Sequence, residues 1–245
     1  MQENQLLILQ DAETQVKELL STKLSKNITF HTLQHTQEVV AACKVLADYH
    51  QLPEDDRNAL LVAAWFHDTG YSSGQARDHE TVSIDLVNEF LTAHSASDEL
   101  KNKITGCINA TRMPQSPATT IERIICGADL FHLGTDDFAE KNRLLRQEFK
   151  EFSNKELSKK EWRKLNIRFL ESHTYFTAYA REKLEPVKAM HLAEIKINEK
   201  SGEGVTSSKK NKDTGKRKDK IAQVAQQAAD IKKKKEKESQ SERGM

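Results

Sequence analysis

The sequence predicts an all-α fold, and three observations support this prediction. Glycine and proline, which disrupt helices, number only 9 and 4 among 245 residues. Apolar residues recur at intervals of three and four, which places them on one face of a helix. No stretch of the sequence shows the apolar–polar alternation that is typical of a half-buried strand.

Nine helices are predicted before residue 199. Leu6, Leu9 and Leu20 lie at helical spacing in the first segment. Pro53 ends the second helix because proline disfavours helix in the residue before it. Gly70 is expected to end the third as a helix terminator. The predicted ranges are 4–21, 31–50, 54–69, 79–94, 97–111, 119–132, 136–153, 158–171 and 174–198.

Polar and proline-containing segments separate the later helices. Residues 71–78 are polar and are expected to form a loop. Pro114 and Pro117 mark a second loop, between the helices at 97–111 and 119–132. The helix at 136–153 is long and highly charged, which is typical of a solvated face.

Composition changes abruptly after Asn198. Residues 199–245 carry a net charge of +6, whereas the rest of the chain carries −5. Residues 200–220 have few apolar side chains, so they are predicted to be a solvated, disordered linker. Residues 221–239 are rich in alanine and lysine and could form a marginal helix. The tail lacks aromatic residues between its basic ones, which argues against sequence-specific nucleic-acid binding. Its charge could attract anionic surfaces, or it could simply keep the protein soluble.

The cysteines and the N-terminus indicate a cytoplasmic protein. Cys43, Cys107 and Cys126 are far apart, odd in number and set in apolar patterns, so we expect buried core residues in a reducing compartment. The N-terminus has no basic segment followed by an apolar run, and no stretch of about 18 apolar residues occurs.

Four residues on predicted helices or at their ends have the chemistry of metal ligands: His35, His67, Asp68 and Asp129. Imidazole nitrogen and carboxylate oxygen suit a divalent ion of intermediate hardness, namely Mn, Fe, Mg, Co, Ni or Zn. Two carboxylates would offset the ion's charge, and open coordination positions would let it activate water. The alternative is that each residue is only a capping or core polar group.

The pattern His…His-Asp…Asp resembles the HD superfamily of phosphohydrolases. The pair occurs in WFHDTGY after an Ala/Leu-rich helix, the first histidine precedes it by 32 residues, and ICGADLFHLG resembles the family's final-aspartate segment. The resemblance covers about residues 25–195. It implies a helical bundle and metal-dependent hydrolysis of a phosphoester, often in a nucleotide. We accordingly divide the chain into an N-terminal helix (1–24), an HD domain (25–198) and a basic tail (199–245).

His31 is the candidate proton donor. In FHTLQHTQEVV it lies four residues before His35, so the two share a helix face. The segment is similar to the His-x-x-x-His of cyclic-nucleotide phosphodiesterases, distant HD relatives, in which the first histidine is a general acid and the second a metal ligand. Imidazole titrates near neutral pH. The alternative is a histidine that merely packs. We count Asp68 with His31 as catalytic candidates.

Two further residues are candidates for substrate binding. His79 follows the polar loop, in a region where many HD enzymes bind a second metal. A second ion is possible, but no histidine lies between His94 and His132, so we favour one ion. Arg112 could hold a phosphate through two hydrogen bonds. Alternatively, His79 is an exposed loop residue and Arg112 is solvated. The side chains expected to line the pocket are those of Trp65, Phe66 and Tyr71.

Two function classes remain open, with a third less favoured. The first is a metal-dependent phosphohydrolase acting on a small phosphorylated substrate, and the second is a catalytically weak HD domain that senses a nucleotide. The third is nucleic-acid binding through the tail. The arrangement also resembles bacterial effectors of cyclic-nucleotide signalling, in which an HD domain precedes a membrane segment. That resemblance predicts that the chain is a fragment of a longer, membrane-tethered protein.

Overall fold

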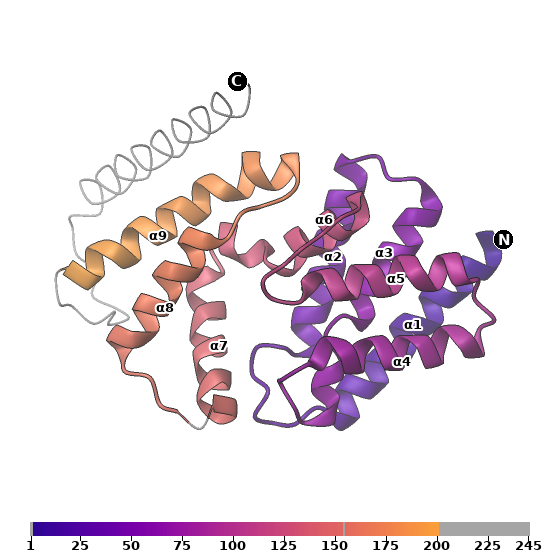
Figure 1. Ribbon diagram of the computed structural model, residues 1–245, viewed down its shortest axis with the longest axis horizontal. Coiled ribbons are helices and arrows are strands. Elements are labelled where there is room, and N and C mark those ends of the chain that lie inside the picture. The colour runs from indigo at the N-terminus through magenta and orange to yellow at the C-terminus, as the bar shows by residue number, and fades with distance from the viewer. Residues whose placement is uncertain (1, 154, 201–245) are drawn as a thin grey trace, which may run out of the picture.

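The computed structural model describes residues 2–153 and 155–200, and within these ranges the all-α prediction is confirmed, with no strand. Figure 1 shows two groups of helices side by side, which we call the first lobe (α1–α6) and the second lobe (α7–α9). The α-helices are α1 (Gln2–Lys23), α2 (Leu33–Tyr49), α3 (Glu54–Phe66), α4 (His79–Ala93), α5 (Asp98–Thr111), α6 (Thr120–Asp129), α7 (Phe138–Ser153), α8 (Lys159–Ser172) and α9 (Glu185–Lys200). Short helical segments are η1 (Thr69–Ser73), η2 (Phe131–Gly134) and η3 (Ala180–Leu184).

The first lobe is built around α3. Every residue of α3 from Asn58 to Phe66 is buried, because α1, α2 and α5 pack around it. Small side chains such as Ala59 and Ala63 let these helices approach closely. The cysteines Cys43, Cys107 and Cys126 are all buried in this lobe, as the sequence predicted. A rigid central helix therefore holds the residues that follow its C-terminal end.

The second lobe has a hydrophobic cluster of its own. It contains Leu133, Phe138, Leu170, Tyr175, Ala180 and Leu184. The segment η2 joins the lobes and contacts both η3 and α9. Gly134 is where they meet most closely: a Cβ atom there would lie 2.5 Å from Leu184 Cβ and 2.6 Å from its Cα. The packing of η2 against η3 thus depends on the absence of a side chain at position 134.

Several predicted boundaries are wrong. The second helix begins at Leu33 and not at residue 31, so His31 precedes the helix and does not share a helix face with His35. The sixth helix ends at Asp129 and not at residue 132. The third helix ends at Phe66, before the expected end at Thr69, and a 3₁₀ segment follows. Gly70 does not act as a C-terminal cap. A Cβ atom there would lie 1.9 Å from the His79 carbonyl oxygen, so glycine is required by this close approach. The last helix was predicted to start at residue 174. In the structure it begins at residue 178 and passes through the π-helical segment η3.

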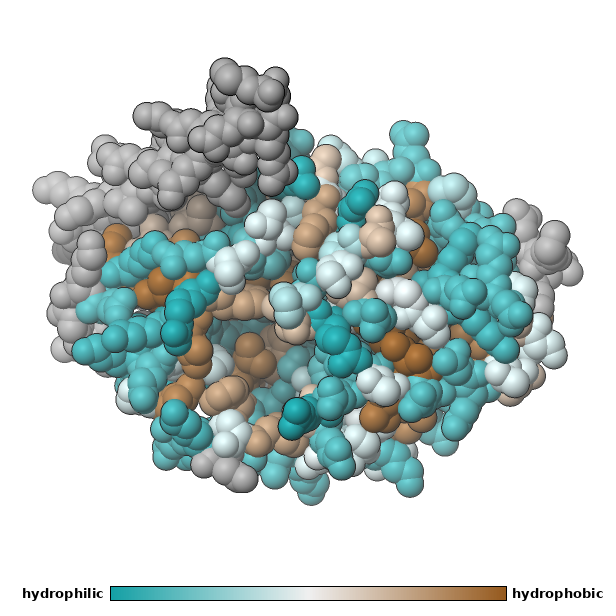
Figure 2. All heavy atoms as spheres, in the orientation of Figure 1, coloured by the Kyte–Doolittle hydropathy of each residue, from teal (hydrophilic) through white to brown (hydrophobic). Residues whose placement is uncertain are grey.

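On the face that Figure 2 shows, the described surface is mainly hydrophilic. In Figure 2 the hydrophobic residues of the first lobe appear as separate small areas on the face shown. None of the described helices combines the length and the apolar character needed to cross a membrane. Residues 201–245, which hold most of the predicted basic tail and its marginal helix, lie outside the described residues. The predicted domain boundaries at 24 and 198 stay predictions.

Candidate metal centre

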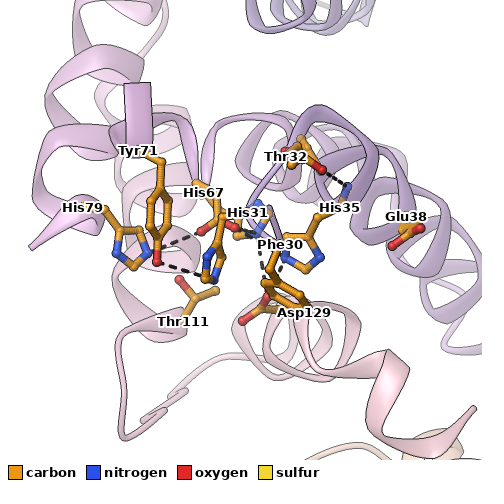
Figure 3. Close-up of polar contacts among 12 residues, drawn as sticks. Phe30, His31, Thr32, His35, Glu38, His67, Tyr71, His79, Thr111 and Asp129 are labelled. Atoms are coloured by element: carbon orange, nitrogen blue, oxygen red, sulfur yellow. Dashed lines mark hydrogen bonds and ion pairs between the residues drawn. The ribbon is translucent and has the colours of Figure 1, made fainter. Parts of the chain in front are cut away.

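The structure brings the four predicted ligands together in the first lobe. His35 lies in the first turn of α2, His67 and Asp68 directly follow α3, and Asp129 is the last residue of α6. His35 Nε2 lies 3.2 Å from Asp129 Oδ1 and 3.4 Å from Asp68 Oδ2. His67 Nε2 lies 3.1 Å from Asp68 Oδ2 and 3.8 Å from Asp129 Oδ1. Figure 3 shows His35, His67 and Asp129 converging from separate elements.

The end of α3 explains how two adjacent residues reach the same place. Neighbours on a regular helix point about 100° apart. His67 still has helical dihedral angles, but Asp68 leaves the helix with φ −109° and ψ 8°. Its carboxylate therefore lies beside the imidazole of His67, with only 4% of Asp68 exposed. The sequence pattern predicted the pair, but not the break in the helix between its members.

Asp129 is positioned by the packing of α6. This helix starts with a capping box between Thr119 and Glu122 and buries Ile121, Ile124 and Ile125 on one face. It is only 10 residues long, so its start and its packed face fix where its last residue lies. The carboxylate of Asp129 faces α2 as a result.

The charges of the cluster depend on one another. Burial alone would lower the pKa of His35, but its hydrogen bond to Asp129 and the nearby Asp68 raise that pKa to about 9. Burial would raise the pKa of Asp68, but the interactions with His67, His35 and His79 hold it well below its ordinary value. The pKa of Asp129 is likewise lowered, mainly by His35 and His67 against the effect of burial. The carboxylates are therefore ionised and ready to bind a cation.

The donor set fits a divalent metal ion. His67 Nδ1 donates to the Ala64 carbonyl at 2.9 Å, which fixes its ring and directs Nε2 at the cluster. Within the described part of the chain, neither His67 Nε2 nor Asp68 Oδ2 has a hydrogen-bond partner, although both atoms are buried. Such atoms are rare unless an ion or water satisfies them. Ligand atoms of His35, His67 and Asp129 all lie within 4.8 Å of one another, so these residues could hold a metal.

An aromatic stack lies beside the cluster. The rings of His31 and Tyr71 are parallel within 10° and 4.2 Å apart, and Tyr71 also contacts His79 at 4.3 Å. Figure 3 shows Tyr71 between the two histidines. His79 Nε2 lies 3.3 Å from Asp68 Oδ1, so His79 belongs to the cluster and is not an exposed loop residue. Burial lowers the pKa of His79, but the contact with Asp68 outweighs this and raises it to about 9.

Glu148 holds His31, and sequence reasoning missed it. One carboxylate oxygen of Glu148 accepts hydrogen bonds from the backbone N–H groups of residues 29, 30 and 31, and the other lies against His31 Nδ1. Glu148 is one of many charged residues in α7, so its residue type gives no signal. Its position does, because it falls in helical register with the buried residues Phe138 and Lys141.

Arg112 lies across the start of α4. Its Nη2 donates to Thr81 Oγ1 at 2.8 Å, and its Nη1 lies 3.4 Å from Asp78 Oδ1 and 3.6 Å from Glu80 Oε2. Arg112 is thus partly exposed but has hydrogen-bonding partners at the start of α4. Its predicted role in binding phosphate is not decided by these contacts.

Two of the three expected pocket walls are core residues instead. Phe66 is fully buried and packs against Phe90. Trp65 is 4% exposed and lies under the ammonium group of Lys17, on the side of α1. Only Tyr71 faces the cluster, because it follows Asp68 in the 3₁₀ turn after α3 has ended.

Comparison with protein families agrees with this geometry. Residues 32–134 match the model of the HD domain family. This stretch of the chain is therefore similar to an HD domain. The matched segment includes all four predicted ligands, and HD domains are generally metal-dependent phosphohydrolases. His31 and Glu148 lie outside it. Comparison with curated proteins and with solved structures gave no significant match.

Proposed function

We propose that this HD domain is a phosphohydrolase that uses one divalent ion, held by His35, His67, Asp68 and Asp129, to cleave a phosphoester in a small nucleotide substrate. The observation that carries the proposal is the buried contact between His67 Nε2 and Asp68 Oδ2, which lie 3.1 Å apart without hydrogen-bond partners in the described residues. Ligand atoms about 2.1 Å from an ion and at right angles lie about 3 Å apart, which agrees with this spacing.

The ion would supply Lewis acidity, because a divalent metal lowers the pKa of water and offsets charge on a phosphoryl oxygen. The remaining steps belong to side chains of the chain itself. His31 lies beside the cluster with its Nε2 3.4 Å from the Tyr71 hydroxyl and is suited to give a proton to the leaving oxygen. Asp68 contacts both His67 and His79, so it links the proposed metal ligands to a residue proposed to bind the substrate.

His79 and Arg112 are the proposed substrate contacts. Both belong to the start of α4 or are held against it, and both are partly exposed. A guanidinium group that is already oriented by Thr81 loses little entropy when it binds phosphate. We propose that these two side chains bind phosphate oxygens that are not transferred.

The first experiment compares wild type, Asp68→Asn and the control Asp85→Asn. Asp85 is exposed on α4, so its substitution removes a carboxylate outside the cluster. Bound metal is measured by elemental analysis, and phosphoester cleavage is measured on a panel of mononucleotides, dinucleotides and cyclic nucleotides. We expect Asp68→Asn to lose both metal and activity, and Asp85→Asn to keep both.

Other results of this experiment would contradict parts of the proposal. Metal in the wild type with no cleavage of any substrate would favour the sensor function. Absence of metal after loading with each of the six candidate ions would show that the ligand assignment is wrong. Equal metal content and activity in Asp68→Asn and wild type would contradict the role of Asp68.

A further inference from the structure

The buried side chain of Glu148, in α7, contacts the segment that precedes α2 at several points. It is 3% exposed, and one carboxylate oxygen accepts from Thr29 N at 2.9 Å, Phe30 N at 2.7 Å and His31 N at 3.1 Å. The second oxygen contacts His31 Nδ1. The two residues are separated by 117 positions, and α7 lies beyond the segment that matches the HD family.

These contacts determine which nitrogen of His31 faces the site. A carboxylate accepts hydrogen bonds, so Nδ1 must donate its proton to Glu148. The other nitrogen, Nε2, then points toward the Tyr71 hydroxyl at 3.4 Å. The parallel stacking on Tyr71 limits rotation of the ring. Burial raises the pKa of Tyr71, and so do the carboxylates around it, so the hydroxyl keeps its proton.

The backbone contacts make this orientation rigid. The Glu148 carboxylate cannot follow a rotating imidazole, because three N–H groups hold its other oxygen in place. Hydrogen bonding keeps it charged: burial would raise the pKa of Glu148, but the bonds to His31 and to the backbone lower it. A fixed and charged acceptor is what a histidine needs to present one defined nitrogen to a substrate.

We propose that Glu148 is the positioning residue for the proton donor His31, so that the second lobe takes part in the reaction although it supplies no metal ligand. The proposal rests on the proposed function. His31 Nδ1 keeps its proton in the hydrogen bond to the Glu148 carboxylate, and Nε2 carries the proton that is transferred. When the phosphorus–oxygen bond breaks, its electron pair goes to the leaving oxygen, which takes the Nε2 proton. The attacking water supplies the new phosphate oxygen, its released proton passes to solvent, and solvent reprotonates Nε2.

The competing explanation is that Glu148 only fastens the segment 29–31 to α7. Both explanations predict a loss of activity on substitution, so the test must distinguish a lost proton transfer from a loosened fold. Leaving groups of different basicity do this. A ribose oxygen must be protonated as it leaves, whereas 4-nitrophenolate is stable without a proton, so only the first needs a general acid.

The substrates are the best nucleotide of the panel, with a ribose oxygen as leaving group, and the 4-nitrophenyl ester of the same phosphate. In the full chain, Glu148→Gln should lower kcat on the nucleotide by about 100-fold and on the aryl ester by less than about 3-fold. His31→Asn should give the same selective loss. The double variant should lose no more than either single variant, because the two residues act as a unit.

Two control variants test the competing explanation. Glu151→Gln makes the same substitution at an exposed site on α7 and should change nothing. Thr29→Val removes the hydrogen bond from Thr29 Oγ1 to the Leu144 carbonyl at 2.9 Å, which belongs to the same contact between the segment and α7. Any loss it causes should be equal on both substrates. Metal content should be unchanged in every variant.

A measurement on the wild type does not depend on whether a variant folds. Nitrogen NMR of the histidine side chains should show, besides the Nδ1–H of His67 that donates to Ala64, a slowly exchanging Nδ1–H signal that is absent in His31→Asn. Equal losses on both substrates in Glu148→Gln, additive losses in the double variant, or an unprotonated Nδ1 at His31 would each overturn the proposal. If instead the wild type binds metal but cleaves no nucleotide of the panel, the proposed function itself fails.

Discussion

At the scale of single residues, Gly70 determines how close the two sides of the metal centre lie. The missing side chain lets the backbone of η1 approach the His79 carbonyl, and the Gly70 N–H donates to Ser83 Oγ at 2.8 Å. Asp68 and His79 are therefore brought to the 3.3 Å that separates their side chains. A residue that has no side chain thus positions two that do.

We expect Gly70→Ala to destabilise the protein by about 3 kcal/mol, because the new methyl group would overlap backbone that cannot move freely. Gly127→Ala is the matched control. Gly127 lies within α6, and its added Cβ would make an ordinary contact with Leu46 Cδ1 at 3.9 Å. That substitution should stabilise the protein by about 0.5–1 kcal/mol through helix propensity. Urea unfolding measures both effects, and losses of equal size would contradict the steric argument.

At the scale of elements, the start of α2 depends on a side chain from α7. Residues 29–31 precede the helix, and Glu148 satisfies their three backbone N–H groups. The N-cap residue Thr32 makes only a long hydrogen bond, 3.5 Å from His35 N. The first turn that carries His35 is therefore held more by tertiary contact than by its own cap.

This arrangement makes the free energy of unfolding depend on pH in the acidic range. Interactions with His31 and the backbone lower the folded-state pKa of Glu148 below its ordinary 4.5. The stabilisation is therefore complete above about pH 4.5 and is lost as the pH falls through the lower, folded-state value. Glu148→Gln should cost about 2–4 kcal/mol at neutral pH, because it removes a buried charged acceptor.

Below pH 4 the difference in unfolding free energy between Glu148→Gln and wild type should shrink, since the variant has no carboxyl group to titrate at this position. Denaturant titrations at a series of pH values measure this difference. A difference in unfolding free energy that stays constant from neutral pH to pH 3 would show that the charge of Glu148 does not contribute to stability.

The elements also show what sequence can and cannot predict. Helical spacing predicted nearly all helices, and the residue pattern predicted that His35, His67, Asp68 and Asp129 would lie together. The late start of the last helix was not predictable. The Tyr175 and Phe176 carbonyls accept from Arg181, and the His173 carbonyl accepts from Lys188 at 2.7 Å, so side chains occupy acceptors that a helix would use. Glu148 was missed for the same reason, because its role depends on a partner 117 residues away.

At the scale of the whole molecule, the proposed ligands connect three helices of the first lobe. His35 comes from α2, the His67–Asp68 pair follows α3, and Asp129 ends α6. An ion bound by these side chains would tie the helices together in the folded state, and the unfolded chain offers no such arrangement. Metal binding should therefore appear as increased stability.

We expect a saturating divalent ion to raise Tm by about 5–10 °C over the same protein in EDTA. This follows from about 2.7 kcal/mol at 100 times Kd and about 2–4 °C per kcal/mol for a chain of this size. Calorimetry with each candidate ion measures the shift. Asp68→Asn should reduce it to near zero, whereas Asp85→Asn should keep it. An equal shift in Asp68→Asn would mean that the ion binds elsewhere.

The contact between Gly134 and Leu184 has a consequence for genetics. Because even a methyl group at position 134 would overlap Leu184, nearly every replacement there should score as harmful in a screen for function. Such data would make Gly134 look like a reacting residue. What selection would be preserving, however, is the close packing of η2 against η3, at a residue that takes no part in the chemistry.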